Sequence, residues 1–488
     1  MSLAIARTLC RASGLSATAI AASFLSVPAI AQESLDGAAD AGQAQAPDAQ
    51  APDAQAPDAQ APTEAAVLPR DPAIAPRTQA DDEAAKFRHF DELAEPGLTT
   101  SVPGAADSVL RDTGGFRSWL AERDIGLQAR ISVVGVYNPL ETGQPRSPQR
   151  YNGQRPTLQF QATNVIATIG LNKVGLPNSR LILGYNSQLT SFDPNGKNTV
   201  GIRNLAFYQS FADRKIELKF GIMPNYYEFV GLFAGGSPIL SSGLTGLIPI
   251  QAGLSADPAS TPTANLTFHF KKGTYVKLGV QRSTAPAGTN YELDHNGPGV
   301  ALTMKGAGPL GIAEVGVKRA ASPSGKQIWV RAGAMYNDSD YTRFDGRGTS
   351  ANQTLYGAAD FQLTQPDVTR PGKGFYAGAS VFWAPDDVNT MTQFYEGRIY
   401  QIAPFASRPL DSAALRVGYT KYSPDAIRSN RARGLHANDH QFSVTGSYTF
   451  HVTNGLYLTP AAAYLKNPSF IGRFKDALNL SGTIYLLL

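Results

Sequence analysis

Charged and hydrogen-bonding side chains recur at every second position in several short runs of this sequence. In the run Lys215–Phe220, Glu217 and Lys219 alternate with three apolar residues. If the apolar face contacts lipid, the charged face points into a lumen, because a charged side chain facing lipid at mid-depth costs about 2–4 kcal/mol. Charged groups make strong hydrogen bonds to hydroxyls, so this chemistry suits non-covalent contact with neutral, hydroxyl-rich solutes.

The same alternation gives a set of candidate pore-lining residues. These are Asn204, Tyr208, Glu217, Lys219, Glu228, Tyr275, Lys277, Gln281, Glu314, Lys318, Arg331, Arg416 and Gln441. Lys219 and Glu228 are the preferred candidates for the constriction. The alternative for each is a solvated wall side chain that contacts no particular solute. The segment Gly231–Pro262 is apolar, Gly-rich and aperiodic, so we expect it either to fold into the lumen and narrow it or to pack between protomers.

Motifs for covalent or metal chemistry are weak. Gly253–Asp257 begins like a nucleophile elbow but lacks the final Gly. His436–His440 gathers ligand-type residues within a polar segment, and Asp338–Gly346 lacks the ligand spacing of a calcium loop. The chain has no Walker loop or dinucleotide fingerprint. We therefore expect no enzyme activity, no cofactor and no metal site.

The N-terminus has the features of a secretory signal. Arg7 and Arg11 precede an apolar stretch, and Val27–Ala31 fits a small-residue cleavage site. Removal of 1–31 lowers the formal net charge from +4 to +2 and removes Cys10, the only cysteine. This excludes disulfides and thiolate sites, and the near-neutral charge argues against nucleic acid. A retained N-terminal anchor is the alternative.

Two segments lie between this signal and the alternating runs. Residues 32–105 are rich in Ala, Pro, Asp and Gln, with the tandem repeat Ala-Pro-Asp-Ala-Gln over 46–60, and they predict a disordered linker or spacer. Residues 106–124 predict a periplasmic helix, with Phe116 and Trp119 on the same face.

Residues 125–488 predict an all-β fold, a transmembrane antiparallel β-barrel of about 16 strands. A soluble sandwich also shows alternation, but one of this length would split into domains joined by linkers. The chain ends in a strand over 480–488, with Leu488 where such barrels usually have an aromatic residue. Aromatic residues near the expected strand ends suggest interfacial girdles. They are Tyr226, Tyr227, Phe229, Tyr336, Tyr341, Trp383, Tyr395, Tyr400, Tyr419 and Tyr422.

Several motifs resemble those of the OprB-like carbohydrate-selective porins. The resemblance begins at Asp112–Ile125, an acidic residue followed by Gly-Gly-x-Arg and a short helix. It continues at Phe207–Phe211, Lys215–Gly221 and Glu228–Phe229, and near the C-terminus at Leu458–Pro460. The sequence departs from the family pattern at Asp124, in the strand carrying Asn204 and Tyr208, and at Thr459 and Ala461. Most of these departures fall on lumen positions and bear on substrate preference.

The resemblance implies an outer-membrane porin for passive diffusion of mono- and small oligosaccharides in a Gram-negative bacterium. Its partners would be sugars, outer-membrane lipid and, by analogy, two further copies in a homotrimer. The alternatives are a general small-solute porin, or a barrel acting as an exporter or scaffold in which 32–105 contacts a periplasmic partner. A barrel-embedded hydrolase ranks last, because no credible nucleophile and base are present.

Overall fold

The computed structural model describes residues 79–140, 156–191, 196–231 and 233–488. The expected signal peptide and the repeats at 46–60 lie outside the described residues. Within them, no helix is long and apolar enough to cross a membrane.

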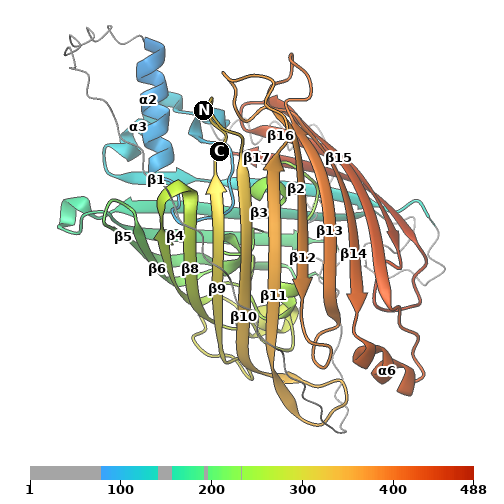
Figure 1. Cartoon of the computed structure of the whole chain (residues 1–488). Coiled ribbons are helices and arrows are strands. Elements are labelled where there is room, and N and C mark those ends of the chain that lie inside the picture. Colours follow the sequence, from blue (N-terminus) through green and yellow to red (C-terminus); the bar gives the residue numbers. More distant parts are fainter. Residues whose placement is uncertain (1–78, 141–155, 192–195, 232) are drawn as a thin grey trace, which may run out of the picture.

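Sixteen antiparallel strands, β2 to β17, close into a barrel (Figure 1). Each strand pairs with the next along the chain, and β17 pairs with β2 to complete the ring. The first eight are β2 (Arg130–Tyr137), β3 (Thr157–Gly170), β4 (Ser179–Thr190), β5 (Thr199–Phe211), β6 (Ile216–Met223), β7 (Thr261–His269), β8 (Thr274–Arg282) and β9 (Pro309–Arg319). The others are β10 (Ile328–Thr342), β11 (Thr349–Gln362), β12 (Gly374–Trp383), β13 (Met391–Ile402), β14 (Ser412–Tyr422), β15 (His440–Thr453), β16 (Leu456–Lys466) and β17 (Ala477–Leu487). The predicted fold class is therefore confirmed. A further short strand, β1 (Ile125–Gln128), precedes β2 and also pairs with β3.

The two ends of the barrel differ in the length of their connections. At one end the turns are short, such as the two residues between β15 and β16. At the other end the connections are longer and include α5 (Thr289–His295) and α6 (Pro424–Ala432). We call these the short-turn end and the long-loop end; α6 lies at the bottom of Figure 1. In outer-membrane barrels the short turns face the periplasm.

Helix α2 (Gln79–Glu92) corrects the prediction of a linker that extends to residue 105. Phe87 and Phe90 are buried, as is Leu93 just beyond the helix. Their spacing of three residues makes one apolar face. This face is easily missed in a sequence because charged residues and Ala surround it. Residues 93–101 then enter the barrel, so the part of the predicted linker that the structure describes is ordered.

The predicted helix over 106–124 is also shorter than expected. Only α3 (Phe116–Ala121) is α-helical, after two 3-10 turns, η1 (Ala105–Asp107) and η2 (Thr113–Gly115). Gly114 and Gly115 have φ of 65° and 71°, which a continuous right-handed helix does not allow. Phe116 and Trp119 are exposed rather than packed against the barrel.

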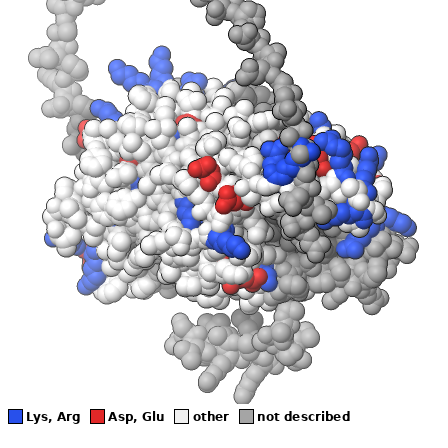
Figure 2. Space-filling view, turned by 90° about the horizontal axis from the view of Figure 1, so that it is seen from below, with Lys and Arg blue, Asp and Glu red and all other residues white. Residues whose placement is uncertain are grey.

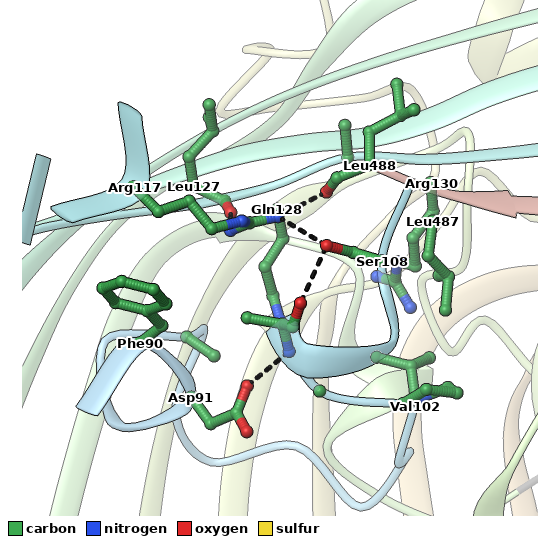
Figure 3. A pocket seen from close by; sticks show the side chains of 15 residues that line it. Phe90, Asp91, Val102, Ser108, Arg117, Leu127, Gln128, Arg130, Leu487 and Leu488 are labelled. Carbon is green, nitrogen blue, oxygen red and sulfur yellow. Dashed lines mark hydrogen bonds between the residues drawn. The ribbon is translucent and has the colours of Figure 1, made fainter. Parts of the chain in front are cut away.

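Both N-terminal helices are fastened to the short-turn end of the barrel (Figure 3). The Arg117 guanidinium donates hydrogen bonds to the carbonyl oxygens of Leu127 and Leu488, each at 2.7 Å. Asp91 accepts a bond from the amide of Ala105 at 2.7 Å. These contacts tie the start of the described chain to its last residue.

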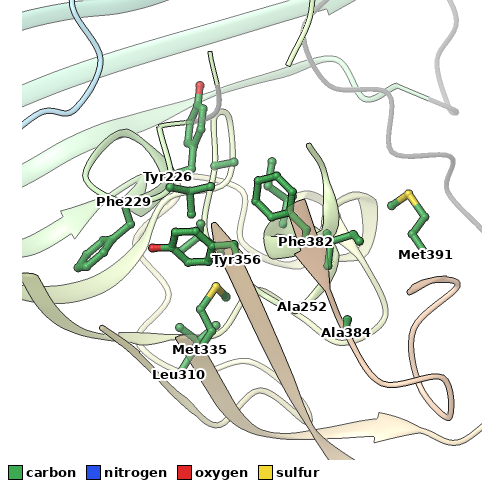
Figure 4. Close-up of a cluster of buried hydrophobic side chains, with 14 of the residues drawn as sticks. Tyr226, Phe229, Ala252, Leu310, Met335, Tyr356, Phe382, Ala384 and Met391 are labelled. Carbon is green, nitrogen blue, oxygen red and sulfur yellow. The ribbon is translucent and has the colours of Figure 1, made fainter. Parts of the chain in front are cut away.

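The connection between β6 and β7, residues 224–260, folds into the barrel rather than outward. It contains η4 (Asn225–Tyr227), η5 (Ala234–Gly236) and α4 (Ile248–Gln251). Its apolar side chains form the largest buried cluster with inward residues of the opposite wall, among them Tyr356 and Phe382 (Figure 4). We call residues 224–260 the lumen loop. It contains the predicted apolar segment except for Thr261 and Pro262, which begin β7, and the described part of that segment packs inside its own barrel.

The predicted aromatic girdle is wrong for six of its ten residues. Tyr336, Trp383, Tyr395 and Tyr419 lie on the exposed outer surface, as a girdle requires. The other six are buried in the lumen loop or on the inner wall: Tyr226, Tyr227, Phe229, Tyr341, Tyr400 and Tyr422. The lumen loop supplies an apolar interior that alternation alone does not predict.

Candidate functional site: the barrel lumen

The strand registers place the predicted pore-lining residues on the inner side of the wall, except Glu228, which lies on the lumen loop. Tyr208 pairs with Lys219 and Lys277 pairs with Glu314, so each pair shares one face. Most of these side chains are buried; Lys318, Arg416 and Gln441 are not. Burial inside a barrel means that other parts of the chain cover them. Whether they line the solute path therefore stays a prediction.

One cluster of charges binds the segment 93–101, which we call the N-terminal strap. The Glu95 carboxylate accepts bonds from Lys219 at 2.9 Å, from Arg203 at 3.0 Å and from the Asn204 amide at 3.1 Å. Lys219 also pairs with Glu228 at 2.6 Å. Burial alone would raise the pKa of Glu95, but Lys219 and Arg203 outweigh it and lower that pKa to about 2. Glu95 is therefore ionised at neutral pH.

Sequence reasoning missed two members of this cluster. Glu95 lay in the predicted linker. Arg203 is the extra residue of a bulge, because Asn204 pairs with Gly184 whereas Ile202 pairs with Tyr185. A bulge breaks the two-residue period, so neighbouring residues both point inward. Arg203 is fully buried and also contacts Asp257 at 3.4 Å.

Basic side chains from four strands, β4, β6, β8 and β9, hold the main chain of the strap. Arg180 donates to the carbonyl of Ala94 at 3.1 Å, and Lys219 to that of Pro96 at 3.1 Å. Further along, Lys277 donates to Gly97 at 3.1 Å and Lys318 to Thr99 at 3.0 Å. Three of the four basic residues are among the predicted lining candidates, and all three bind the chain itself.

A second group of candidates holds the start of the lumen loop. The Glu314 carboxylate accepts bonds from the Val230 amide at 2.7 Å and from the hydroxyls of Tyr275 and Tyr356 at 2.8 Å each. Arg331 donates to the carbonyls of Val230 at 2.8 Å and Gly231 at 2.9 Å. These groups act on the loop backbone.

A chain of alternating charges continues around the wall from Arg331. Asp360 binds Arg331 at 3.3 Å and Arg398 at 2.8 Å. Glu396 then binds Arg398 at 3.1 Å and Arg416 at 2.8 Å. Sequence reasoning named Arg331 and Arg416 but missed the three residues between them, although Glu396 and Arg398 follow the same two-residue period.

Arg416 joins this charge chain to the middle of the lumen loop. Its guanidinium donates to the carbonyls of Ser242, Gly243 and Leu244. The remaining candidates bond within the wall or to the loop: Tyr208 donates to Glu217 at 2.6 Å, and Gln281 donates to the carbonyl of Gly253 at 3.0 Å. Gln441 lies apart from both charge clusters, on β15.

The inner side of β15 to β17 is different in chemistry and in exposure. Its side chains in the half of the barrel nearer the long loops are small and uncharged, and they are partly exposed. We call this surface the hydroxyl wall; it consists of Ser443, Thr445, Ser447, Ala461, Ala463, Asn479 and Ser481. The register places Thr445 opposite Ala463, and Ala463 opposite Asn479. In a closed barrel, inward exposure of this kind means open space in the lumen.

The hydroxyl wall ends toward the short-turn end, where the lumen loop touches the barrel. The Thr449 hydroxyl donates to the carbonyl of Ile239 at 2.8 Å. Ile239 packs with Tyr457, Tyr485 and Leu487 in an apolar cluster. This contact forms the floor of the open space.

The long-loop face shows charged side chains of both signs (Figure 2). Near the middle of this view, acidic and basic side chains lie beside one another, with further basic side chains toward the rim. The mouth is therefore mixed in charge.

Residues of two of the three weak motifs make ordinary structural contacts. Ser255 is fully buried and accepts a bond from the amide of Asn225 at 2.9 Å, while Asp257 accepts one from the Tyr227 hydroxyl at 2.7 Å. His440 contacts its neighbour Asp439 at 2.7 Å. Among the described residues, no three His, Cys, Asp or Glu side chains gather closely enough to hold a metal ion.

Comparison with known proteins agrees with this geometry. No sequence among the curated proteins matches the chain. Among solved structures, the Pseudomonas putida OprB at high pH matches with a TM-score of 0.66 and 14% identity, covering 78% of this chain and 98% of that one. The low-pH structure of the same protein matches with a TM-score of 0.51 and the same identity and coverage. The sequence of residues 174–484 matches the family described as carbohydrate-selective porin, OprB family. With a match over more than half of its length, this chain belongs to the OprB family of carbohydrate-selective porins of the Gram-negative outer membrane.

Proposed function

We propose that this porin passes mono- and small oligosaccharides by passive diffusion along the hydroxyl wall, between β15–β17 and the edge of the lumen loop. The observation that carries the proposal is the partial exposure of Ser443, Thr445 and Ser447 inside a closed barrel. Serine and threonine hydroxyls and the Asn479 amide can donate and accept hydrogen bonds, as neutral sugars require. The family and the fold are those of a channel rather than of an enzyme.

The packed charges support selectivity against ions. Arg331, Arg398 and Lys219 already have carboxylate partners at 2.6–3.3 Å. A mobile ion would have to compete with partners that are fixed in place. A neutral solute on the hydroxyl wall competes with none of them.

Liposome swelling with the purified protein tests the proposal. We expect faster swelling with monosaccharides than with amino acids of similar size. Rates that depend on size alone would favour the general small-solute porin. An absence of swelling would contradict the channel and favour the scaffold or exporter alternative, in which residues 32–105 contact a periplasmic partner.

We propose in addition that the outer wall contacts lipid and that three copies assemble. Apolar side chains such as Leu205, Phe220 and Val417 are exposed on the outer surface, which supports lipid contact. The trimer rests on analogy with other porins. The mass of the purified protein in detergent tests it, and a monomeric mass would contradict it.

A further inference from the structure

We infer that the N-terminal strap is a displaceable plug over a basic lane of the lumen, and that carboxylate-bearing solutes pass through this lane once the strap leaves. The inference rests on the proposed channel function. It concerns a different part of the lumen from the hydroxyl wall, namely the inner side of β4 to β9.

Four basic lumen side chains bind the main chain of the strap, and the lumen loop adds two main-chain hydrogen bonds, from the amides of Thr99 and Ser101 to the carbonyls of Tyr227 and Gly236 at 2.8 Å each. Arg180, Lys219, Lys277 and Lys318 come from four different strands and donate to four strap carbonyls at 3.0–3.1 Å. Backbone carbonyls carry only partial negative charge. A solute with full negative charge would therefore be a stronger partner for Arg180, Lys277 and Lys318 than the strap carbonyls are.

Glu95 shows that the lane holds a complete carboxylate site. Its carboxylate has three donors within 3.1 Å, from two cations and one amide. Arg203 is fully buried, and Lys219 and Asn204 are nearly so. The groups that recognise Glu95 are the groups that would recognise the carboxylate of an acidic sugar. In the resting chain, Glu95 occupies the place of that solute.

The strap is anchored on both sides by contacts outside the lane. Before it, Phe87 and Phe90 are buried with helix α2. After it, Asp107 accepts bonds from His451 at 2.9 Å and from the Gly455 amide at 3.0 Å. The strap can therefore leave the lane as a loop while both anchors stay in place.

Departure of the strap would leave the lane with an excess of positive charge. Glu228 remains beside Lys219 and Asp257 beside Arg203, and Glu217 and Glu314 also face inward from β6 and β9. These four acids stand against five basic residues, namely Arg180, Arg203, Lys219, Lys277 and Lys318. Arg180 and Lys318 lose the carbonyl groups that they bind in the resting chain, and Lys277 keeps its bond to the carbonyl of Glu228 at 2.8 Å. An open lane of this composition attracts anions and concentrates them at its entrance.

Glu95→Ala removes the charged contact and tests the plug. The matched control is Glu122→Ala, because the Glu122 side chain follows helix α3, is 74% exposed and pairs with the exposed Arg123. For both variants and the wild-type chain, we would measure swelling with glucuronate and glucose, and reversal potentials across a KCl gradient in planar bilayers. We expect Glu95→Ala to raise the glucuronate rate about threefold and to shift the reversal potential toward anion selectivity. Glu122→Ala should match the wild-type chain.

Gly97→Val tests displacement without a change of charge. Gly97 has φ of 84°, and an added Cβ would lie 2.9 Å from a Glu228 oxygen. The side chain should therefore expel the strap sterically and reproduce the effect of Glu95→Ala. If Glu95→Ala does not fold, this variant alone tests whether displacement of the strap opens the basic lane.

The inference is overturned if folded Glu95→Ala and Gly97→Val keep the wild-type glucuronate rate, or if only the reversal potential changes. Glucose swelling of the wild-type chain, measured in the same vesicles, tests the proposed function separately. A chain that fails with glucose but shows the variant effects on both the glucuronate rate and the reversal potential would support the plug and contradict the proposed sugar channel.

Discussion

The inner wall of β5 to β14 and the inner wall of β15 to β17 differ in the charge and in the burial of their side chains. The first carries charged residues such as Arg203, Arg331 and Asp360, all fully buried. The second carries Ser, Thr, Ala and Asn side chains that remain partly exposed. Charge is therefore greatest where the lumen is filled, and the open part of the lumen is uncharged.

This difference shows that inward-facing charge does not by itself identify a solute path. A lumen loop and a strap bring many backbone carbonyls into the barrel, and buried carbonyls need donors. Arg416 and Lys277 supply such donors to the loop and the strap. A buried charge in turn needs a partner, which explains the alternating chains of acids and bases.

The largest effect is expected from a variant in the filled part of the lumen, where the charged side chains are buried. Asp360→Asn removes the carboxylate shared by Arg331 and Arg398 and leaves buried positive charge without compensation. We expect a loss of about 3–5 kcal/mol in the free energy of unfolding. Denaturant unfolding of the barrel, followed by its heat-dependent gel mobility, measures it. Wild-type stability would mean that these charges are hydrated, contrary to the buried cluster.

The second-largest effect is expected on sugar swelling, from a variant that fills space at the hydroxyl wall. Ala463→Trp fills space at the hydroxyl wall, whereas Ala462→Trp adds the same ring on the outer surface one residue away. We expect sugar swelling to fall about fivefold or more in the first variant, because pore width controls passage, and to stay unchanged in the second. Equal rates in the two variants would place the solute path elsewhere.

A smaller effect is expected on single-channel conductance when the pH is lowered. The pKa of Glu95 is about 2, below its ordinary value of 4.5. The ionic contribution to strap binding is therefore complete above about pH 4.5 and is lost as the pH falls through about 2. Single-channel conductance should stay constant from pH 7 to pH 4.5 and change only below that. A transition centred near pH 4.5 would show that Glu95 is solvated and the strap is loose.

The smallest effect is expected at an exposed ion pair on α6. Arg428 lies 2.6 Å from Asp425, but its side chain is 71% exposed. Because solvent screens such pairs, Arg428→Ala should change the free energy of unfolding by less than about 1 kcal/mol. A loss as large as that of Asp360→Asn would remove the contrast between surface and lumen charges.

The two-residue period was enough to predict the barrel and the inward side of its strands. Outward Ile216 and Phe220 against inward Glu217 and Lys219 show why, since lipid and lumen select opposite side chains at successive positions. Helix α2, which precedes the strap, was missed because a short amphipathic helix in a charged, Ala-rich segment resembles a linker. Its order comes from tertiary contacts of Phe87 and Phe90.

The lumen could be predicted only in part. The apolar composition of the lumen loop indicated insertion, but no local pattern shows that Arg416 binds its backbone across the barrel. The bulge at Arg203 turns this side chain toward the lumen although its neighbour Asn204 also points inward. Counting alternate positions cannot find such a bulge. The hydroxyl wall consists of small side chains, whose types alone do not indicate a solute path. Its place beside open space depends on which segments fill the rest of the lumen.

The path itself can be tested most directly by cysteine accessibility. The only native cysteine is Cys10, within the expected signal peptide, so a new cysteine can be labelled alone. Thr445 lies on the hydroxyl wall, whereas Thr267 faces inward on β7 and is buried. We predict that a charged, water-soluble thiosulfonate labels Thr445→Cys and lowers sugar swelling, while Thr267→Cys stays unlabelled and unaffected. Labelling and block at Thr267→Cys, with Thr445→Cys unaffected, would contradict the account.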